Sequence, residues 1–315
     1  MRNRLRILTW HVHGNYLYYL SQVPHDFYVI ADATRSPGYA GRTGSLPWGD
    51  NIIDLPIEPV REQEFDCVLY QHRQGWEKDR VHLLSDAQRR LPAIYLEHDP
   101  PQEHPTDTRH WVDDANTLLV HCTHFNQLMW DSGKSSTCVV EHGVKPLSAA
   151  QYSGEFDRGI VVVNNLPRRG RRLGADVFHA VREHVPLDLV GMDAERAGGI
   201  GEIENNRLPA HMTRYRFFFN PIRWTSMGLA VIEAMMVGLP IVALATTEMS
   251  AVIRDGETGF IDTRVERLVE HMHVLLKNPE EARRLGAAAR AMAAERFHID
   301  RFVADWLAVF QRVCA

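Results

Sequence analysis

The chain has 315 residues, of which 45% are hydrophobic, and its formal net charge at pH 7 is −5. This length suffices for about two domains with cores of their own. The negative charge argues against a protein that binds nucleic acid through bulk electrostatics. The sequence contains no apolar run of 18 residues, and no small-residue cleavage site follows its basic start. We therefore expect a cytoplasmic protein without a cleaved leader or a membrane span.

Short apolar runs alternate with helix-like segments through the first half of the chain. Such alternation predicts a parallel sheet with helices on both faces. We expect strands over residues 5–12, 27–32, 65–71, 93–98, 117–123 and 137–144, and helices over 77–90 and 124–132.

A polar stretch with proline and glycine at residues 145–159 interrupts this pattern and marks a domain boundary. A second alternating run follows, and three helices then close the chain. Thr263 and Glu266 predict a capping box for the first of these helices, and Asn278 is the expected N-cap of the second. The last carries an apolar stripe that must cover another surface. In this second half we expect strands over 160–165, 187–192, 215–221 and 240–245, and helices over 173–184, 227–237 and 300–313.

The predicted fold is therefore α/β, with two Rossmann-like doubly wound domains that face each other across an interdomain cleft. The first domain covers residues 1–146, the second covers 147–297, and a final helix covers 298–315. Open parallel sheets bind ligands outside the carboxyl ends of their strands. Ligand chemistry in the cleft is the expected function.

Two predicted strand ends carry residues that suit a ligand. Gly14 and Asn15 follow the first strand, where glycine lets a ligand approach the backbone closely; a simple turn explains the pair equally well. The loop NNLPRRGRR at residues 164–172 follows the first strand of the second domain and precedes a helix. Its cationic side chains and the free N–H groups of the helix suit a diphosphate, although any single arginine can also belong to a solvated face.

Glu233 is a lone carboxylate in the apolar stretch of residues 223–246. Good helix formers predict that it lies on a helix, capped by Thr225 or Ser226 and packed against a sheet. A buried carboxylate there needs a partner. A diphosphate would suit the helix start, and ribose hydroxyls would be the partner that the Glu233 carboxylate needs. The alternative partner is a neighbouring arginine.

The histidines and cysteines give weaker signals. His98 and Asp99 fall where a predicted strand reaches the expected cleft. His121 and His124 have the spacing of metal ligands, but packing is the more common role at a strand-to-helix transition. No D-x-D pair ends a strand, so we expect no metal site. The four cysteines lack a C-x-x-C pair and favour buried thiols over a disulfide framework or a zinc site.

The segment 224–261 resembles the donor-binding segment of family-four retaining glycosyltransferases, which have the GT-B fold. The remaining chain agrees more loosely, at Gly14-Asn15, at the strand that ends in His98 and at EHGV (141–144). The resemblance implies an acceptor-side first domain, a nucleotide-sugar donor domain and a last helix that crosses back onto the first domain. The matching residues are Gly228-Leu229, Glu233-Ala234-Met235, Gly238-Leu239-Pro240, Asp255-Gly256 and Thr258-Gly259-Phe260.

The family places two glutamates eight positions apart, the second at the donor ribose and the first near the donor sugar. Glu233 matches the second, whereas Thr225 stands at the position of the first. The family's phosphate-binding arginine and lysine fall on Asn165 and Arg169. The candidates to replace the missing arginine are Arg168, Arg171, Arg172 and Arg223.

The resemblance thus implies catalytic roles for His98, Arg169 and Glu233, with His98 hydrogen-bonded to a hydroxyl on the acceptor or sugar side. The implied donor contacts are Gly14, Asn15, Asn165, Arg169, Thr225, Ser226, Met227, Gly228, Leu229 and Glu233.

The implied reaction transfers a sugar from a nucleotide-diphosphate donor with retention of configuration and needs neither metal nor cofactor. The acceptor stays open between a saccharide, a lipid-linked molecule and a small molecule, and the arginines at 168–172 would allow weak peripheral membrane contact. No nucleic-acid partner is expected. One alternative is a GT-B-fold sugar-nucleotide epimerase. The other is a non-catalytic sugar-nucleotide-binding homologue, which Thr225 and Asn165 favour because they replace a glutamate and an arginine of the family.

Overall fold

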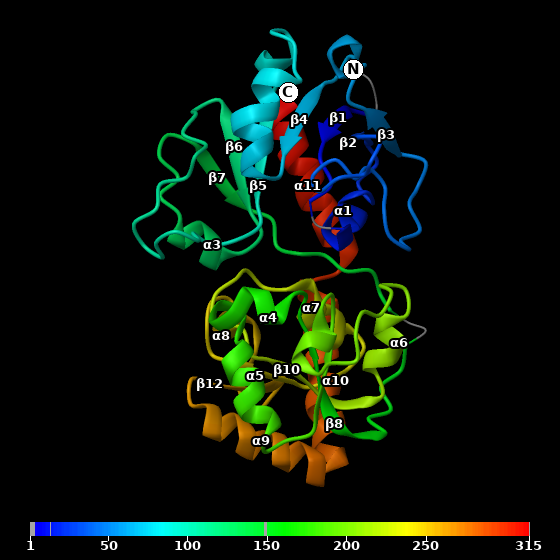
Figure 1. The fold of residues 1–315 in the computed structure, drawn as a ribbon, viewed down its shortest axis with the longest axis vertical. Coiled ribbons are helices and arrows are strands. Elements are labelled where there is room, and N and C mark those ends of the chain that lie inside the picture. The colour runs from blue at the N-terminus through cyan, green and yellow to red at the C-terminus, as the bar shows by residue number, and fades with distance from the viewer. Residues whose placement is uncertain (1–3, 13, 148–149, 315) are drawn as a thin grey trace. The chain divides into compact units, whose positions relative to one another are not determined.

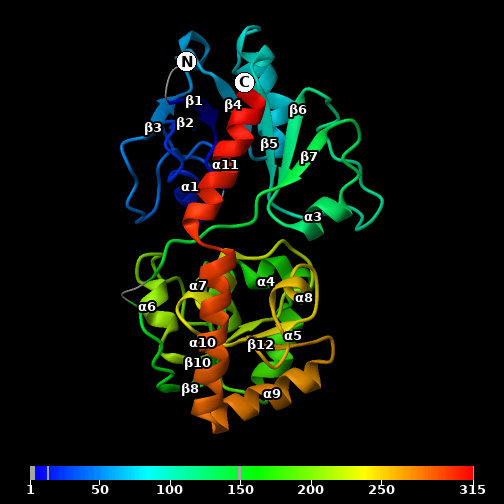
Figure 2. The ribbon, with the colours of Figure 1, turned by 180° about the vertical axis from the view of Figure 1, so that it is seen from behind.

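The computed structural model describes residues 4–12, 14–147 and 150–314. The chain divides into two compact units (Figures 1 and 2). The first unit extends to Gly143 and also contains the chain from Ile299 onward, and the second comprises Val144–His298. Each unit is built around one parallel sheet.

Within the described residues, the first unit has a seven-stranded parallel sheet in the order β3-β2-β1-β4-β5-β6-β7. The chain runs outward from β1 to β3, returns to β4 and continues in the opposite direction, so the topological switch point lies between β1 and β4. The strands are β1 (Arg6–Thr9), β2 (Asp26–Ala31), β3 (Ile52–Pro56), β4 (Cys67–Tyr70), β5 (Ala93–Glu97), β6 (Thr117–His121) and β7 (Ser136–Val139).

Helix α11 (Ile299–Cys314) packs within the first unit. Its Phe302, Trp306 and Phe310 are fully buried, and Trp306 Nε1 donates a hydrogen bond to the Tyr16 hydroxyl of α1 (Gly14–Leu20) at 3.2 Å. Figures 1 and 2 both show α1 beside α11. This burial accounts for the apolar stripe of the last helix.

The helix expected over residues 77–90 is wrong, because the structure breaks it into three pieces. These are a π-helical turn (Gly75–Asp79), α2 (Arg80–His82) and a 3-10 turn (Gln88–Arg90). Ser85 N donates to Gln88 Oε1 at 2.9 Å, and Gln88 N donates to Ser85 Oγ at 3.3 Å. Such side-chain bonds to the backbone compete with continuous helix. Helix α3 (His124–Met129) lies within the predicted range 124–132.

The described part of the second unit has a five-stranded parallel sheet in the order β9-β8-β10-β11-β12. Because β8 is the first strand along the chain and β10 the third, the switch point lies between these two neighbours. The strands are β8 (Phe156–Val162), β9 (Leu187–Val190), β10 (Tyr215–Asn220), β11 (Ile241–Leu244) and β12 (Gly259–Asp262). The helices are α4 (Leu166–Arg169), α5 (Ala175–Arg182), α6 (Leu208–Met212), α7 (Leu229–Met236), α8 (Met249–Val252), α9 (Val265–Lys277) and α10 (Pro279–Arg296).

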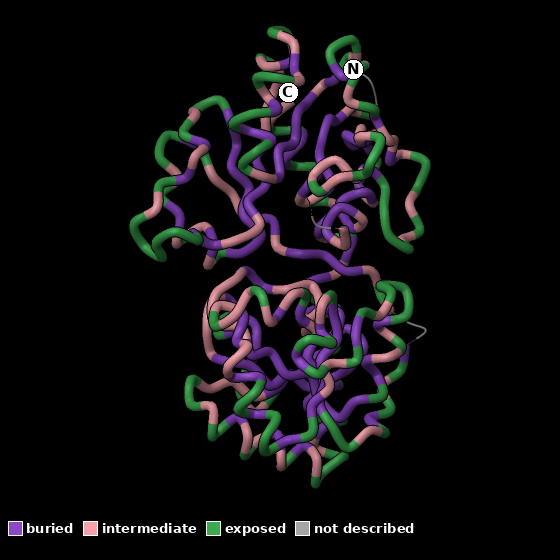
Figure 3. The backbone as a smooth tube through the Cα atoms, in the orientation of Figure 1, coloured by how far each residue is buried: buried purple, intermediate pink, exposed green. Residues whose placement is uncertain are grey.

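The strands carry the cores of both units. Figure 3 shows buried backbone along them and exposed backbone on outer helices and loops. In the second unit, Val161, Phe217 and Val242 from three adjacent strands join one hydrophobic cluster with residues of α5 and α9. The sheets are therefore rigid platforms whose carboxyl ends carry the loops described below.

Three helix starts test the predicted caps. Asn278 is confirmed, because its side chain accepts from Glu281 N at 3.2 Å. The Thr263 capping box is wrong: α9 has Arg264 at its N-cap and no side-chain cap. Thr225 and Ser226 are also not caps, since α7 begins at Leu229 with extended Gly228 at the N-cap.

Candidate functional site

Two loops meet at the switch point of the second sheet, residues 163–172 after β8 and residues 221–228 after β10. The backbone N–H groups of Arg223 and Trp224 both donate to Arg172 O at 3.1 Å. Gly174 lies below this junction with φ +80°, and a Cβ there would stand 1.9 Å from Pro221 O. The two loops therefore form one fixed surface. In Figures 1 and 2, α4 and α7 lie at the same end of this unit.

Asn165 shapes the first loop through its backbone. Its φ of 55° is left-handed, a conformation that asparagine tolerates better than most residues. Its N–H donates to Met192 O at 2.7 Å, and its carbonyl accepts from Arg169 N at 3.0 Å. This turn starts α4, whose last turn carries Arg168 and Arg169. Asn165 thus has a local structural role that an arginine would fill less readily.

Asp176 at the start of α5 holds two of the loop arginines. Arg223 binds its carboxylate through both terminal nitrogens, at 2.5 and 2.9 Å, and Arg171 binds it at 2.5 Å. These bonds, first that of Arg223, lower the pKa of Asp176 below its usual range. Two of the four arginines proposed to replace the missing one are therefore engaged. Within the described chain, the side chains of Arg168 and Arg172 have no hydrogen bond or ion pair.

The start of α7 borders open space. An added Cβ on Gly228 would meet no atom within 4 Å, and no side chain caps this end of the helix. The Ser226 hydroxyl is buried without a hydrogen-bond partner among the described residues. Free N–H groups of the first helical turn and an unpaired hydroxyl make this end of α7 a suitable place for an anion.

Glu233 lies on α7, one turn beyond Leu229, so the two are separated by about 6 Å along the helix axis. It is 6% exposed, as the apolar stretch predicted. Thr225 is half-buried in the loop before α7, and Met227 is buried. The structure thus brings six of the predicted donor residues together on one loop and helix. They are Thr225, Ser226, Met227, Gly228, Leu229 and Glu233.

His98 belongs to the first unit, directly after β5. Gln71 donates through Nε2 to Thr9 Oγ1 at 2.9 Å and to Trp10 O at 2.8 Å, so its Oε1 faces His98 Nε2 at 3.2 Å as the acceptor. The proton of neutral His98 therefore sits on Nε2, and Nδ1 faces Cys122 Sγ at 3.8 Å. A hydroxyl that approaches His98 must compete with Gln71 or displace this weak sulfur contact.

Gly14 and Asn15 start α1 in the first unit. Gly14 has no positive φ, and an added Cβ would lie 3.4 Å from His11 Nε2. Backbone strain therefore does not require glycine here. The structure groups Gly14, Asn15 and His98 in one unit and the remaining predicted residues in the other.

His121 supports the packing interpretation of the His121–His124 pair. It is fully buried, and neither ring nitrogen has a hydrogen-bond partner in the described structure. Burial lowers its pKa to about 3. The described residues contain no group of three or more histidine, cysteine or acidic side chains placed to hold a metal ion.

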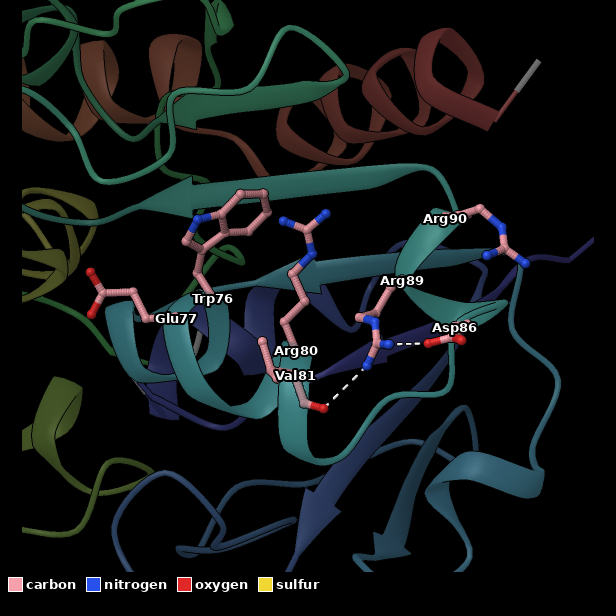
Figure 4. Close-up of a pocket in the computed structure, with 7 residues that line it drawn as sticks. All are labelled: Trp76, Glu77, Arg80, Val81, Asp86, Arg89 and Arg90. Atoms are coloured by element: carbon pink, nitrogen blue, oxygen red, sulfur yellow. Dashed lines mark hydrogen bonds and ion pairs between the residues drawn. The ribbon is translucent and has the colours of Figure 1, made fainter.

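A hollow of about 650 Å³ lies elsewhere in the first unit (Figure 4). The Arg80 guanidinium stacks 4.3 Å from the centre of the Trp76 ring, and Arg89 pairs with Asp86 and donates to Val81 O at 3.2 Å. None of the predicted site residues lines this hollow.

Sequence reasoning missed Asp176, the unpaired Ser226 hydroxyl and a buried Glu97–His110 pair beside His98. Asp176 had a sequence signal, because an acidic residue follows a loop with four arginines. The contact of Glu97 with His110 spans 13 positions across an irregular segment, and no local pattern predicts it.

Residues 196–292, which include β10, α7, β11 and β12, match the family model described as Glycosyl transferases group 1. This segment of the second unit therefore resembles the group 1 glycosyltransferases. Glu233 lies within the matched segment.

The chain is similar over part of its length to proteins with different names. It is 36% identical to the trehalose synthase of Pyrococcus horikoshii over 80 residues, which are 25% of this chain and 19% of that one. It is 24% identical to the GDP-mannose-dependent alpha-(1-6)-phosphatidylinositol dimannoside mannosyltransferase of Mycobacterium tuberculosis over 64% of this chain and 45% of that one. The chain therefore matches less than half the length of either relative.

Solved structures share the GT-B fold along nearly the whole chain. Sucrose-phosphate synthase from Thermosynechococcus elongatus has a TM-score of 0.70 at 14% identity, covering 98% of this chain and 99% of that one. Anabaena HepE in complex with UDP has a TM-score of 0.70 at 13% identity, covering 98% and 100%. No helix in the described ranges has both the length and the hydrophobicity to cross a bilayer.

Proposed function

We propose that this chain transfers a sugar from a nucleotide-diphosphate donor to an acceptor, with retention of configuration and without a metal ion. The observation that carries the proposal is the open space at Gly228, where the uncapped start of α7 adjoins the arginine loop after β8. Both loops follow the two strands at the switch point, where open α/β sheets bind ligands. A diphosphate suits this surface in size and charge.

Arg168, Arg169 and Arg172 hold the diphosphate in this proposal, together with the first N–H groups of α7. Negative charge builds on the departing diphosphate as the bond to the sugar breaks, and fixed donors stabilise it. The Ser226 hydroxyl, which lacks a partner among the described residues, gains one from a phosphate oxygen. Cationic side chains and amides supply the charge that a divalent ion supplies in other enzymes.

Glu233 binds the ribose of the donor. A carboxylate accepts hydrogen bonds through two oxygens and so suits a vicinal pair of hydroxyls. UDP is bound by HepE, and the mycobacterial relative is GDP-mannose-dependent; uracil and guanine are therefore the bases to test first. Thr225 stands at the position of the family's first glutamate, so in this proposal a hydroxyl holds the donor sugar at that point.

His98, Gly14 and Asn15 of the first unit contact the sugar or the acceptor in this proposal. His98 accepts a hydrogen bond from a hydroxyl through Nδ1, in place of the contact with Cys122 Sγ.

Turnover of nucleotide sugars tests the reaction directly. We expect release of the nucleoside diphosphate that is unchanged by EDTA, and a product whose anomeric configuration by NMR equals that of the donor. Loss of activity with EDTA would contradict metal independence, and an inverted anomer would contradict retention.

A second candidate is a non-catalytic sugar-nucleotide-binding protein, and the observation that favours it is Thr225 at the position of a family glutamate. This protein would bind the nucleotide sugar without turnover. Thr225→Glu, which restores the carboxylate, separates the two candidate functions. If the wild type shows no turnover and Thr225→Glu does, the natural chain is the non-catalytic binding protein.

A further inference from the structure

A buried hydrogen-bond network lies directly beside His98. Glu97, the last residue of β5, is 6% exposed. Its Oε1 accepts from the backbone N–H of Asp99 at 2.9 Å, and its Oε2 lies 3.0 Å from His110 Nε2. One carboxylate thus connects the end of β5 to the irregular segment that follows it.

The protons in this network are assigned by its geometry. Val112 N donates to His110 Nδ1 at 3.0 Å, so Nδ1 is an acceptor and the proton of the neutral ring is on Nε2. Nε2 therefore donates to Glu97. The His110 ring packs 4.4 Å from Trp111 and 4.8 Å from Trp130 between ring centroids, which fixes its orientation. Burial lowers the pKa of His110 to about 3, so the ring stays neutral.

The carbonyl groups of the same turn are held from α3 and its C-cap. Asn126 Nδ2 donates to His98 O at 3.2 Å, and Trp130 Nε1 donates to Asp99 O at 2.8 Å. Asn126 is fully buried, and Trp130 is 6% exposed. The backbone on both sides of the His98 side chain is therefore tied to three buried side chains, with Glu97 as the only charged one among them.

We propose that Glu97, braced by His110, is a positioning residue that fixes His98 for the transfer reaction. The inference rests on the proposed function, because it takes His98 to contact the sugar or the acceptor. Glu97 does not touch the substrate in this account. It holds the Asp99 amide and so sets the direction in which His98 leaves β5.

The network works fully only when Glu97 is ionised. Both of its oxygens face N–H donors, so a protonated carboxyl places an O–H against one of them and loses that bond. Burial raises the pKa of Glu97 to about 8. The titratable groups around it are Asp99, His110, Tyr95, Cys122 and His121, the last being the register partner of Glu97 on β6. His98 is therefore held more firmly as the pH rises through about 8.

Glu97→Gln tests this directly, because glutamine has the shape and the hydrogen-bond limits of the protonated carboxyl at every pH. The full chain is assayed between pH 6.5 and 9 with a nucleotide sugar whose nucleoside diphosphate binds to the protein. In the wild type we expect kcat to rise at least fivefold with a midpoint near pH 8. In Glu97→Gln the rise is absent and kcat at pH 9 is at least fivefold lower, while KM for the donor stays within twofold.

Tyr95→Phe is the matched control. Tyr95 lies on the same strand, is buried and packs against the His110 ring, but the structure gives it no bond to the turn at residues 98–99. The proposal requires that this variant keeps the pH-dependent rise. A rise that survives in Glu97→Gln, or disappears equally in Tyr95→Phe, would overturn it. If Glu97→Gln does not fold, Trp130→Phe is tested in its place. We then expect kcat to fall at least threefold and to keep its rise with pH. An unchanged kcat in Trp130→Phe counts against the proposal.

A spectroscopic readout separates this inference from the proposed function. In protein labelled with ¹⁵N-histidine, the His98 ring resonances are expected to shift with a midpoint near pH 8 in the wild type and to stay constant in Glu97→Gln. Binding of nucleoside diphosphate by both proteins is expected to be equal. No binding by either protein contradicts the proposed function alone, whereas equal His98 titration in both contradicts the role of Glu97.

Discussion

At the residue scale, the arginines of the two loops after β8 and β10 divide into two groups. Arg171 and Arg223 share the Asp176 carboxylate and thereby hold the two loops together. Arg168 and Arg172 have no such bond within the described chain. The sequence showed how many cations the loop has, but only the fold shows which of them have a carboxylate nearby.

Arg169→Ala is expected to weaken binding of a nucleoside diphosphate by about 1.5 to 3 kcal/mol, the usual range for a hydrogen bond to a charged group. Affinity for the bare nucleoside should not change. Isothermal titration calorimetry with both ligands measures the difference. Arg171→Ala is the matched control, because this arginine is paired with Asp176; equal losses for both ligands would remove Arg169 from the phosphate site.

His121 gives the chain a predictable response to acid. Burial lowers its pKa from the ordinary histidine value of 6.5, which applies to the unfolded chain, to about 3 in the folded protein. Between these values the unfolded chain binds the extra proton, so stability is lost as the pH falls below about 6.5, with a slope that approaches about 1.4 kcal/mol per pH unit.

His121→Leu removes this titration and both unpaired nitrogens. Urea unfolding at pH 7.5 and 5.5 is therefore expected to show a smaller loss of stability for the variant than for the wild type. The same pH dependence in both proteins would contradict the assignment of a buried neutral histidine.

At the element scale, the start of α7 is the feature that sequence patterns placed least well. Helix propensity extended the helix to residue 227 and suggested a hydroxyl cap, whereas the structure starts it at Leu229 behind an extended glycine. The start of a helix is usually predicted from its side-chain cap. A helix start that faces a ligand lacks that cap, so sequence patterns place it poorly.

Gly228→Ala tests whether that open helix start is a ligand site. The residue has φ −72° and ψ 137°, which alanine adopts without strain, and the added methyl meets no atom. We expect an unchanged melting temperature and at least tenfold weaker binding of the diphosphate. Gly174→Ala, which would crowd Pro221 O at φ +80°, should instead destabilise the fold. Full affinity in Gly228→Ala would place the diphosphate elsewhere.

Most strands were predictable because buried parallel strands are short, apolar and bounded by turns. Strand β8 was expected from residue 160 but starts at Phe156. Its first residues form no apolar run, because Asp157 and Arg158 are exposed. The glycine after them is one at which a Cβ would meet Phe217. Strands β3 and β12 carry aspartates and border loops, so no apolar run indicated them. The Glu97–His110 pair depends on tertiary contact and lay beyond sequence reasoning.

At the scale of the whole molecule, the two sheets have complementary roles in the account. The second unit carries the arginine loop, the open end of α7 and Glu233, and the matched family segment lies in it. The first unit holds His98 on a buried network and is completed by the last helix of the chain. In the proposed function, the second unit binds the donor, and His98 of the first unit contacts the sugar or the acceptor.

The most direct test of the central claim is thermal unfolding with UDP, GDP, ADP and the matching nucleosides. A ligand that binds only the folded state stabilises it by about 2.7 kcal/mol at a hundredfold excess over Kd. We predict that one diphosphate raises the melting temperature far more than its nucleoside, and that Gly228→Ala and Glu233→Gln reduce this shift. If no diphosphate shifts the wild type, or if both variants shift as the wild type does, the site at the start of α7 is contradicted.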